Sequence, residues 1–154
     1  MLGVLITVGN QRKLEGKKHG ERMRSIKREK LQELYEATEI YYDYQTRELI
    51  AHLVMAKNEK IFSHDKIGDD DLIVKVLMLS ELWFPQLDDK ASLLRGVARK
   101  IEKCCVEIRH NLLHGTPISK NEKIDELKSY ADELNSTYAL FLHSIVDLFR
   151  KNFP

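Results

Sequence analysis

The sequence predicts an all-α protein, a four-helix antiparallel bundle of long helices. Its 154 residues are 43% hydrophobic, which suits one domain with a buried core. Helix-breaking residues are scarce, because between Glu21 and His114 the only glycines are Gly68 and Gly96 and the only proline is Pro85. Apolar residues recur every three or four positions, as on one face of a helix. The connections are short, which favours antiparallel neighbours.

The first predicted helix covers residues 25–62, and its inward stripe includes polar side chains. The three neighbouring tyrosines in this helix are able to stack on bases, but we expect them to pack against another helix. They are Tyr41, Tyr42 and Tyr44. The stripe consists of Leu31, Leu34, Thr38, Tyr41, Gln45, Leu49 and His52.

The second predicted helix covers residues 71–84 and is apolar almost throughout. Its length favours a buried helix over a buried strand, and Pro85 ends it. Residues 69–71 are three aspartates, which we interpret as the N-terminal cap of this helix. They lack the alternate spacing of a calcium loop, so the sequence predicts no metal site there.

The third and fourth helices carry the clearest patterns. Residues 89–114 form the third helix, capped by Asp88 or Asp89 and ended by Gly115 in a left-handed conformation. Residues 120–151 form the fourth, where Ser119 and Glu122 have the spacing of a capping box. Uninterrupted steps of three and four are typical of a bundle or coiled coil. The two stripes are Leu94, Val97, Ile101, Cys104, Ile108 and Leu112, then Ile124, Leu127, Ala131, Leu134, Tyr138, Phe141, Ile145 and Leu148.

Charge is distributed unevenly, although the net charge is only +1. Residues 1–30 hold nine basic and three acidic side chains, a net charge of +6, so the rest of the chain sums to −5. We divide the chain into a basic leader, residues 1–24, and a helical domain, residues 25–154. The leader is either flexible or an extension of the first helix, and it is able to hold phosphates of nucleic acid or of anionic lipid.

The start of the leader resembles the end of a membrane anchor, because apolar residues 1–8 precede the basic residues. Eight residues are too few to span a bilayer, so the sequence permits only a peripheral membrane contact. The run also lacks the features of a signal peptide. Two adjacent cysteines, Cys104 and Cys105, form neither a disulfide framework nor a zinc knuckle. We therefore expect a reduced, cytoplasmic compartment, with no cofactor and no bound metal.

The segment with the most chemical information is Arg109-His110-Asn111-Leu112-Leu113-His114, followed by Gly115. It resembles the R-x(4–6)-H motif of the HEPN superfamily, in which Asn, Asp or His usually follows the Arg and Gly often follows the His. The family fold is an all-α bundle with this motif at or just before the start of its last helix. The predicted helices from about residue 25 to 152 agree with a HEPN-like domain.

The resemblance implies a metal-independent endoribonuclease of a toxin or antiviral-defence type. Such proteins dimerise, so that two motifs form one cleft. Other members have lost catalysis, and the alternative is therefore a catalytically silent HEPN-like module that binds RNA or a protein partner. The implied partners are RNA, a second copy of the chain, and a cognate antitoxin or regulatory protein.

The residues of the motif suit RNA cleavage. His114 is expected to remove the proton of a ribose 2′-hydroxyl, because imidazole titrates near neutral pH, and the second subunit's His114 then acts as the acid. Arg109 is expected to hold the phosphate through paired hydrogen bonds. His110 orients the site or contacts phosphate, and Asn111 positions the substrate. On a regular helix Arg109 and His114 lie about 140° apart, whereas His110 and His114 share a face.

Simpler structural roles stay open for the same residues. His114 at the end of a helix offsets the negative end of the helix dipole. Arg109 has acidic candidates for an ion pair, namely Glu102, Glu107 or an acid of the fourth helix. A third reading is a purely structural protein that assembles through the seam of its last helix. Three other histidines are expected at structural or surface positions, namely His52, His64 and His143.

Overall fold

The computed structural model describes residues 2–61, 70–115 and 119–153. These residues form four helices, and no strand occurs among them, which confirms the all-α prediction. A single 3-10 turn, Pro85–Leu87, joins the second and third helices. The helices are α1 (Leu2–Asn58), α2 (Asp70–Trp83), α3 (Asp88–His114) and α4 (Lys120–Asn152).

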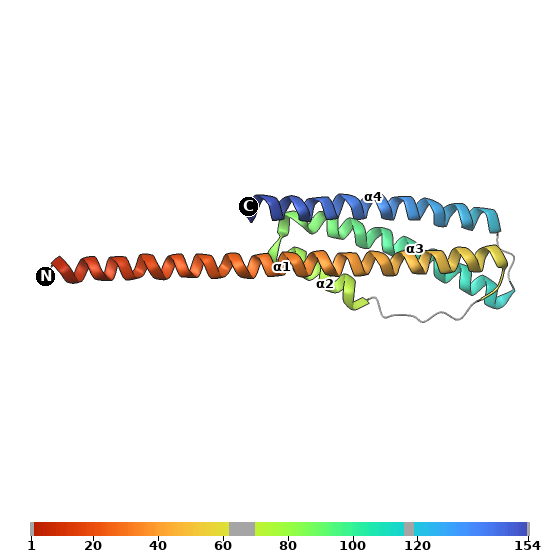
Figure 1. Ribbon diagram of the computed structural model, residues 1–154. Coiled ribbons are helices and arrows are strands. Elements are labelled where there is room, and N and C mark those ends of the chain that lie inside the picture. Colours follow the sequence, from red (N-terminus) through yellow and green to blue (C-terminus); the bar gives the residue numbers. More distant parts are fainter. Residues whose placement is uncertain (1, 62–69, 116–118, 154) are drawn as a thin grey trace.

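The helices alternate in direction along the chain, as in an antiparallel bundle (Figure 1). The short helix α2 runs back along α1, and α3 and α4 then traverse the bundle in opposite directions. The helix α1 contacts each of the other three, and α3 packs closely on α4. One end of the bundle therefore gathers the end of α3 and the start of α4, while the C-terminus lies at the other end.

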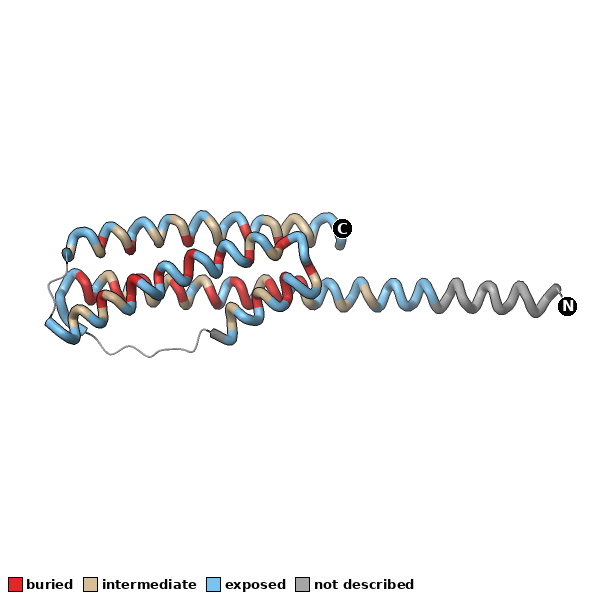
Figure 2. The backbone as a smooth tube through the Cα atoms, turned by 180° about the vertical axis from the view of Figure 1, so that it is seen from behind, coloured by how far each residue is buried: buried red, intermediate tan, exposed pale blue. Residues whose placement is uncertain are grey.

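The buried residues confirm the predicted stripes (Figure 2). All seven positions of the α1 stripe are buried, and five of the six α3 positions are buried, with Leu112 half-buried. In α4 the seam consists of five buried positions and three half-buried ones, Ala131, Tyr138 and Leu148. Such burial is the main source of stability of a bundle, because each helix hides its apolar face against the others.

Polar residues of the α1 stripe find partners inside the helix. The Thr38 hydroxyl donates to the Leu34 carbonyl at 2.7 Å, and the Nδ1 atom of His52 lies 2.8 Å from the Glu48 carbonyl oxygen. These bonds satisfy polar groups that would otherwise destabilise the core. The structural role predicted for His52 is therefore confirmed, since its exposed fraction is 2%.

Two of the three tyrosines, Tyr41 and Tyr42, pack between helices, as predicted. Tyr41 is buried. The Tyr42 ring stacks on the ring of Tyr138 in α4, with centroids 3.9 Å apart and planes inclined by 13°. Its hydroxyl donates to the Oδ1 atom of Asn135 at 2.6 Å. These contacts occupy the ring of Tyr42 and join α1 to α4.

The limits of α1 differ from the predicted residues 25–62 at both ends. The helix begins at Leu2, so the basic leader is an extension of the first helix, which is one of the two predicted alternatives. Lysine, arginine and leucine favour a helix, and this part of α1 contains no proline. At the other end α1 stops at Asn58, because Glu59 has a positive φ of 52°. Within the described ranges, no helix has both the length and the apolar character needed to cross a membrane.

The caps of the other helices agree with the sequence only in part. Gly115 ends α3 in a left-handed conformation, φ 61° and ψ 23°, and its N–H donates to the Asn111 carbonyl, as predicted. The prediction that Asp88 or Asp89 caps α3 is wrong. The 3-10 turn leads directly into the helix, so that Leu87 is the N-cap and both aspartates lie in the first turn. There their negative charges interact favourably with the positive end of the helix dipole.

The capping box predicted at the start of α4 is wrong with respect to the hydrogen bond of the Ser119 side chain. Ser119 is the N-cap, but its side chain makes no capping bond, and its carbonyl accepts the N–H of Lys123 at 3.0 Å instead. His64, Asp69 and the side chain of Asp70 lie outside what the structure describes, whereas Asp71, the third aspartate of the predicted cap, is exposed in the first turn of α2.

Candidate functional site

The last two turns of α3 place two histidines side by side on the solvent face. The helix is regular through His114, and its inner face is fixed by buried Cys104, Cys105 and Ile108. His110 and His114 are both exposed, and their ring centroids lie 4.4 Å apart with planes inclined by 49°. Neither ring forms a hydrogen bond to another described residue, so both remain open to a ligand.

Arg109 lies on a different side of α3. It is half-buried, and its Nε atom is buried without a hydrogen-bond partner in the part of the chain that the structure describes. The charges of Arg109 and of Glu48 in α1 both act on the Cys105 thiol, so Arg109 lies on the side of α3 that faces α1. Since α3 is regular, Arg109 and His114 remain about 140° apart. A single chain therefore does not bring them together.

The ion pair suggested between Arg109 and an acidic residue is not formed among the described residues. Glu107, one of the suggested partners, pairs with Lys123 at 2.8 Å instead. Asn111 is half-buried, and its carbonyl is engaged by Gly115. The side chain of Asn111 has no shown role in the fold.

The structure adds three cations to the histidine face of α3. Arg95, Arg99 and Lys103 are all exposed. On a regular helix they share with His110 and His114 a sector about 100° wide and about 28 Å long. We call these five residues the α3 basic row. Sequence reasoning missed it, although spacings of 4, 4, 7 and 4 residues carried the signal. Glu102 is an exposed acid at the edge of this sector, so the row is predominantly but not wholly cationic.

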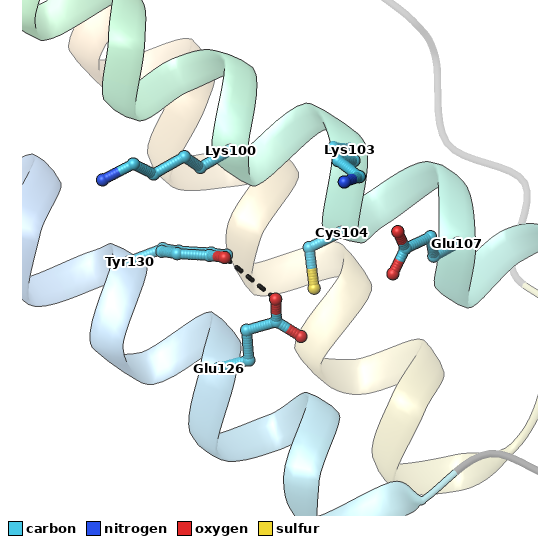
Figure 3. Close-up of a pocket in the computed structure, with 6 residues that line it drawn as sticks. All are labelled: Lys100, Lys103, Cys104, Glu107, Glu126 and Tyr130. Carbon is cyan, nitrogen blue, oxygen red and sulfur yellow. Dashed lines mark hydrogen bonds between the residues drawn. The ribbon is translucent and has the colours of Figure 1, made fainter.

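A depression between α3 and α4 lies beside the basic row (Figure 3). Its volume is about 330 Å³, and none of the residues predicted from the motif lines it. Tyr130 donates to Glu126 at 2.9 Å, and the Cys104 sulfur lies close to this pair. The depression is lined by Lys100, Lys103, Cys104, Glu107, Glu126 and Tyr130.

The cysteines are unsuited to nucleophilic chemistry. Burial, more than the neighbouring Glu126 carboxylate, raises the pKa of the Cys104 thiol to about 12. Burial likewise raises the pKa of Cys105 far above its ordinary value. Both groups are therefore protonated thiols near neutral pH, and a thiol is a far weaker nucleophile than a thiolate. The depression is not a cysteine-dependent active site.

Lys123 joins two carboxylates at the rim of this depression. Its Nζ atom lies 2.8 Å from Glu107 and 2.7 Å from Glu126. These hydrogen bonds raise the pKa of Lys123 far above its ordinary value, and the bond from Lys123 holds the pKa of Glu126 below its usual range. The three residues link α3 to the first turns of α4 and thereby support the end of α3 that carries the histidines.

Replacing Lys123 with methionine is expected to lower the free energy of unfolding by about 1 kcal/mol at pH 7, after discounting for partial exposure. Because the folded-state pKa of Glu126 is lowered, its contribution is present above pH 4.5 and is lost as the pH falls through the folded value. The difference between wild type and variant in urea unfolding should therefore shrink as the pH is lowered below 4.5.

The matched control is Lys128→Met, because Lys128 pairs with Asp125 at 3.2 Å but both side chains are well exposed. This change should leave stability nearly unaltered. An equal loss in the two variants would contradict the role given to Lys123.

Metal binding finds no support in the site. His110 and His114 have the spacing of a ligand pair, but a structural zinc site needs further protein ligands. No group of three or more potential ligands from His, Cys, Asp and Glu occurs among the described residues. The chemistry available to the α3 basic row is that of imidazoles and fixed cations, which suits a phosphate-bearing ligand.

Comparison with known proteins gives no relative for this chain: it matches no protein-family model, and neither a curated protein nor a solved structure is significantly similar to it.

Proposed function

We propose that the chain is a metal-independent endoribonuclease that acts as a homodimer, of the toxin or antiviral-defence type implied by its HEPN-like motif. The observation that carries the proposal is the α3 basic row, in which two accessible imidazoles continue a line of three cations. Cations spaced along a protein surface bind the phosphates of an RNA strand, and imidazoles transfer protons near neutral pH. The toxin or defence role rests on the resemblance alone.

The reaction assigned to this site is transesterification of the RNA backbone. His114 takes the proton of a ribose 2′-hydroxyl, whose oxygen attacks the adjacent phosphorus. The bond from phosphorus to the 5′-oxygen breaks, and the leaving oxygen takes a proton from the second subunit's His114. The products are a 2′,3′-cyclic phosphate and a 5′-hydroxyl. His110, in ring contact with His114, positions that imidazole.

A second subunit is required because Arg109 points away from His114 of its own chain. In the proposed dimer, Arg109 of one chain stabilises the charge that builds on the phosphate held against His114 of the other. The unpartnered Nε of Arg109 supports this assignment, since buried polar groups normally have a partner. Asn111 takes the secondary role of contacting substrate.

The experiment measures RNA cleavage in the presence of EDTA by wild type and variants that are purified in parallel. Wild type should release fragments with cyclic phosphate ends, whereas Arg109→Ala and His114→Ala should each cleave at least about a hundredfold more slowly. Wild type co-expressed with an equal amount of His114→Ala should retain about a quarter of the activity of the same total amount of wild type, because half of the dimers are then mixed and each lacks one of the two imidazoles that the reaction needs. Failure of wild type to cleave under these conditions overturns the nuclease; a mixture that retains half of the activity overturns the composite site.

The second candidate is a catalytically silent HEPN-like module that binds RNA. The separation of Arg109 from His114 within one chain favours it. This module would bind labelled RNA without cleaving it, and the combined change of Arg95, Arg99 and Lys103 to glutamine would weaken binding and flatten its salt dependence. Binding with cleavage in the experiment above would exclude this candidate.

A further inference from the structure

The first part of α1 projects beyond the bundle as a single helix (Figures 1 and 2). The side chains described there belong to residues 16–30, which we call the projecting segment. All of them are exposed except three half-buried ones, Met23, Ile26 and Lys30, and Leu31 is the first buried residue that follows. The segment therefore offers most of its circumference to a partner.

The projecting segment is strongly basic. It holds seven cations and two acids, Glu21 and Glu29, a net charge of +5. Around the helix axis the cations leave no gap wider than about 80°, so they form a collar rather than a stripe. Only Lys30 pairs with a described carboxylate, that of Glu33 at 2.7 Å. The collar consists of Lys17, Lys18, Arg22, Arg24, Lys27, Arg28 and Lys30.

The distribution of these side chains suits a nucleic-acid strand better than a lipid surface. A helix lying on a bilayer needs a broad apolar face, but Met23 and Ile26 are the only large apolar side chains of the segment. The collar also extends over about 20 Å of the helix axis, too far for all its cations to meet one layer of lipid phosphates. A nucleic-acid strand carries a phosphate at every nucleotide and can follow cations placed along an axis.

The α3 basic row continues the collar along the molecule. The helices α1 and α3 run in the same direction, and α3 begins at the end of the bundle from which α1 projects (Figure 1). Arg95 is therefore the member of the row nearest to the collar, and His114 is the farthest. Because the collar has cations on every side, a strand that leaves the exposed face of α3 meets a cation on whichever side it reaches α1.

We propose that the collar is a second RNA-binding element, and that one single strand runs from the collar along the α3 basic row to His114. This inference rests on RNA being the ligand of the α3 basic row, which the nuclease and the silent RNA-binding module share. Contacts to phosphates carry no sequence information. The collar therefore adds affinity without sequence preference, and it favours RNAs long enough to reach both sets of cations.

The test is binding of a labelled single-stranded RNA of about 16 nucleotides, the upper end of the site sizes of single-strand binding domains. The chain carries His114→Ala throughout, so that the RNA stays intact. The collar variant changes every collar cation except Lys30 to glutamine, which favours a helix as lysine and arginine do. A strand on one side of the helix meets about half of these cations, so about three contacts are lost. At about 0.15 M salt the affinity should fall at least about tenfold, and the slope of log K against log salt should become shallower by about 2.

The control variant combines Arg47→Gln with Lys128→Gln. These residues are exposed cations outside the collar and the row, and each pairs with an acid of its own helix. Their loss should leave the affinity for RNA nearly unaltered. Circular dichroism and thermal unfolding confirm that each variant retains the bundle.

A further variant tests whether one strand spans both sets of cations. Changing Arg95, Arg99 and Lys103 to glutamine should also weaken binding of the same RNA. Combined with the collar variant, the two losses of affinity should multiply, because distant changes that act on one bound strand add in free energy. If the two sets of cations bound separate RNAs, one of the variants would leave the affinity of the tighter site unaltered.

The outcomes separate this inference from its rivals. Unaltered affinity for RNA in the collar variant overturns it, and unaltered affinity in the α3 variant overturns the continuous strand. If the collar variant keeps its affinity for RNA but no longer co-sediments with phosphatidylcholine vesicles that contain about 30% phosphatidylserine, the partner is an anionic lipid. Cleavage is judged separately. A chain that binds RNA through the collar but does not cleave it removes only the nuclease, whereas a chain that cleaves while its collar variant binds normally removes only this inference.

Discussion

Phe141→Ala is expected to lower the free energy of unfolding by about 3–5 kcal/mol. Phe141 is fully buried in α4, at the centre of the helix that packs on both α1 and α3. Removing the ring loses its burial free energy and leaves a cavity whose walls lose contacts. For a chain of this length the melting temperature should fall by roughly 6–20 °C. Urea unfolding monitored by circular dichroism measures the change directly.

The neighbouring residue provides a matched control. Leu140 precedes Phe141 on the same helix but is 52% exposed, so Leu140→Ala should change the free energy of unfolding by less than about 1 kcal/mol. The difference in unfolding free energy between the two variants tests which face of α4 points toward the core. A larger effect at Leu140 than at Phe141 would mean that the helix presents a different face to the core.

His114→Ala is expected to reduce metal-free RNA cleavage by about 10²–10⁴-fold, the usual contribution of a positioned general base or acid. His114 is exposed at the end of α3 and lies outside the core, so stability should change little. RNA binding should also persist, because Arg95, Arg99 and Lys103 remain. The predicted signature is therefore a loss of kcat with nearly unaltered affinity for RNA.

The control for this variant is His143→Ala. His143 is also an exposed histidine, lies in the C-terminal half of α4, and pairs with Asp147 at 3.4 Å. It should retain full cleavage. Equal activity of wild type and His114→Ala would remove His114 from the mechanism, and an equal loss in both variants would mean that the effect is not specific to His114.

The core of this fold could be predicted well from the sequence, because the apolar spacing along a long helix does not depend on how the helices pack. The stripes of α1, α3 and α4 depend only on the helical period, and the structure buries them. The caps depend on how the chain enters each helix, which residue types alone do not determine. Asp88 is an excellent capping residue by type, yet the turn before it places Leu87 at the cap.

The candidate site was less accessible to sequence reasoning. The pairing of His110 with His114 follows from their spacing and is confirmed. The depression between α3 and α4 was not predictable, since Lys103 and Glu107 meet Glu126 and Tyr130 only when the register of α3 on α4 is fixed. Likewise, whether Arg109 reaches a second subunit depends on an interface that no pattern in one chain encodes.

The contact of Tyr42 with α4 has a consequence for the position of α1 along the axis of α4. Heptad seams nearly repeat themselves, so two helices packed only through leucine and isoleucine could slide by one turn at modest cost. A slide of one turn, about 5.4 Å, would separate the stacked rings of Tyr42 and Tyr138 and break the bond to Asn135. This cross-helix contact therefore selects one longitudinal setting of α1 against α4 from several that apolar packing would tolerate.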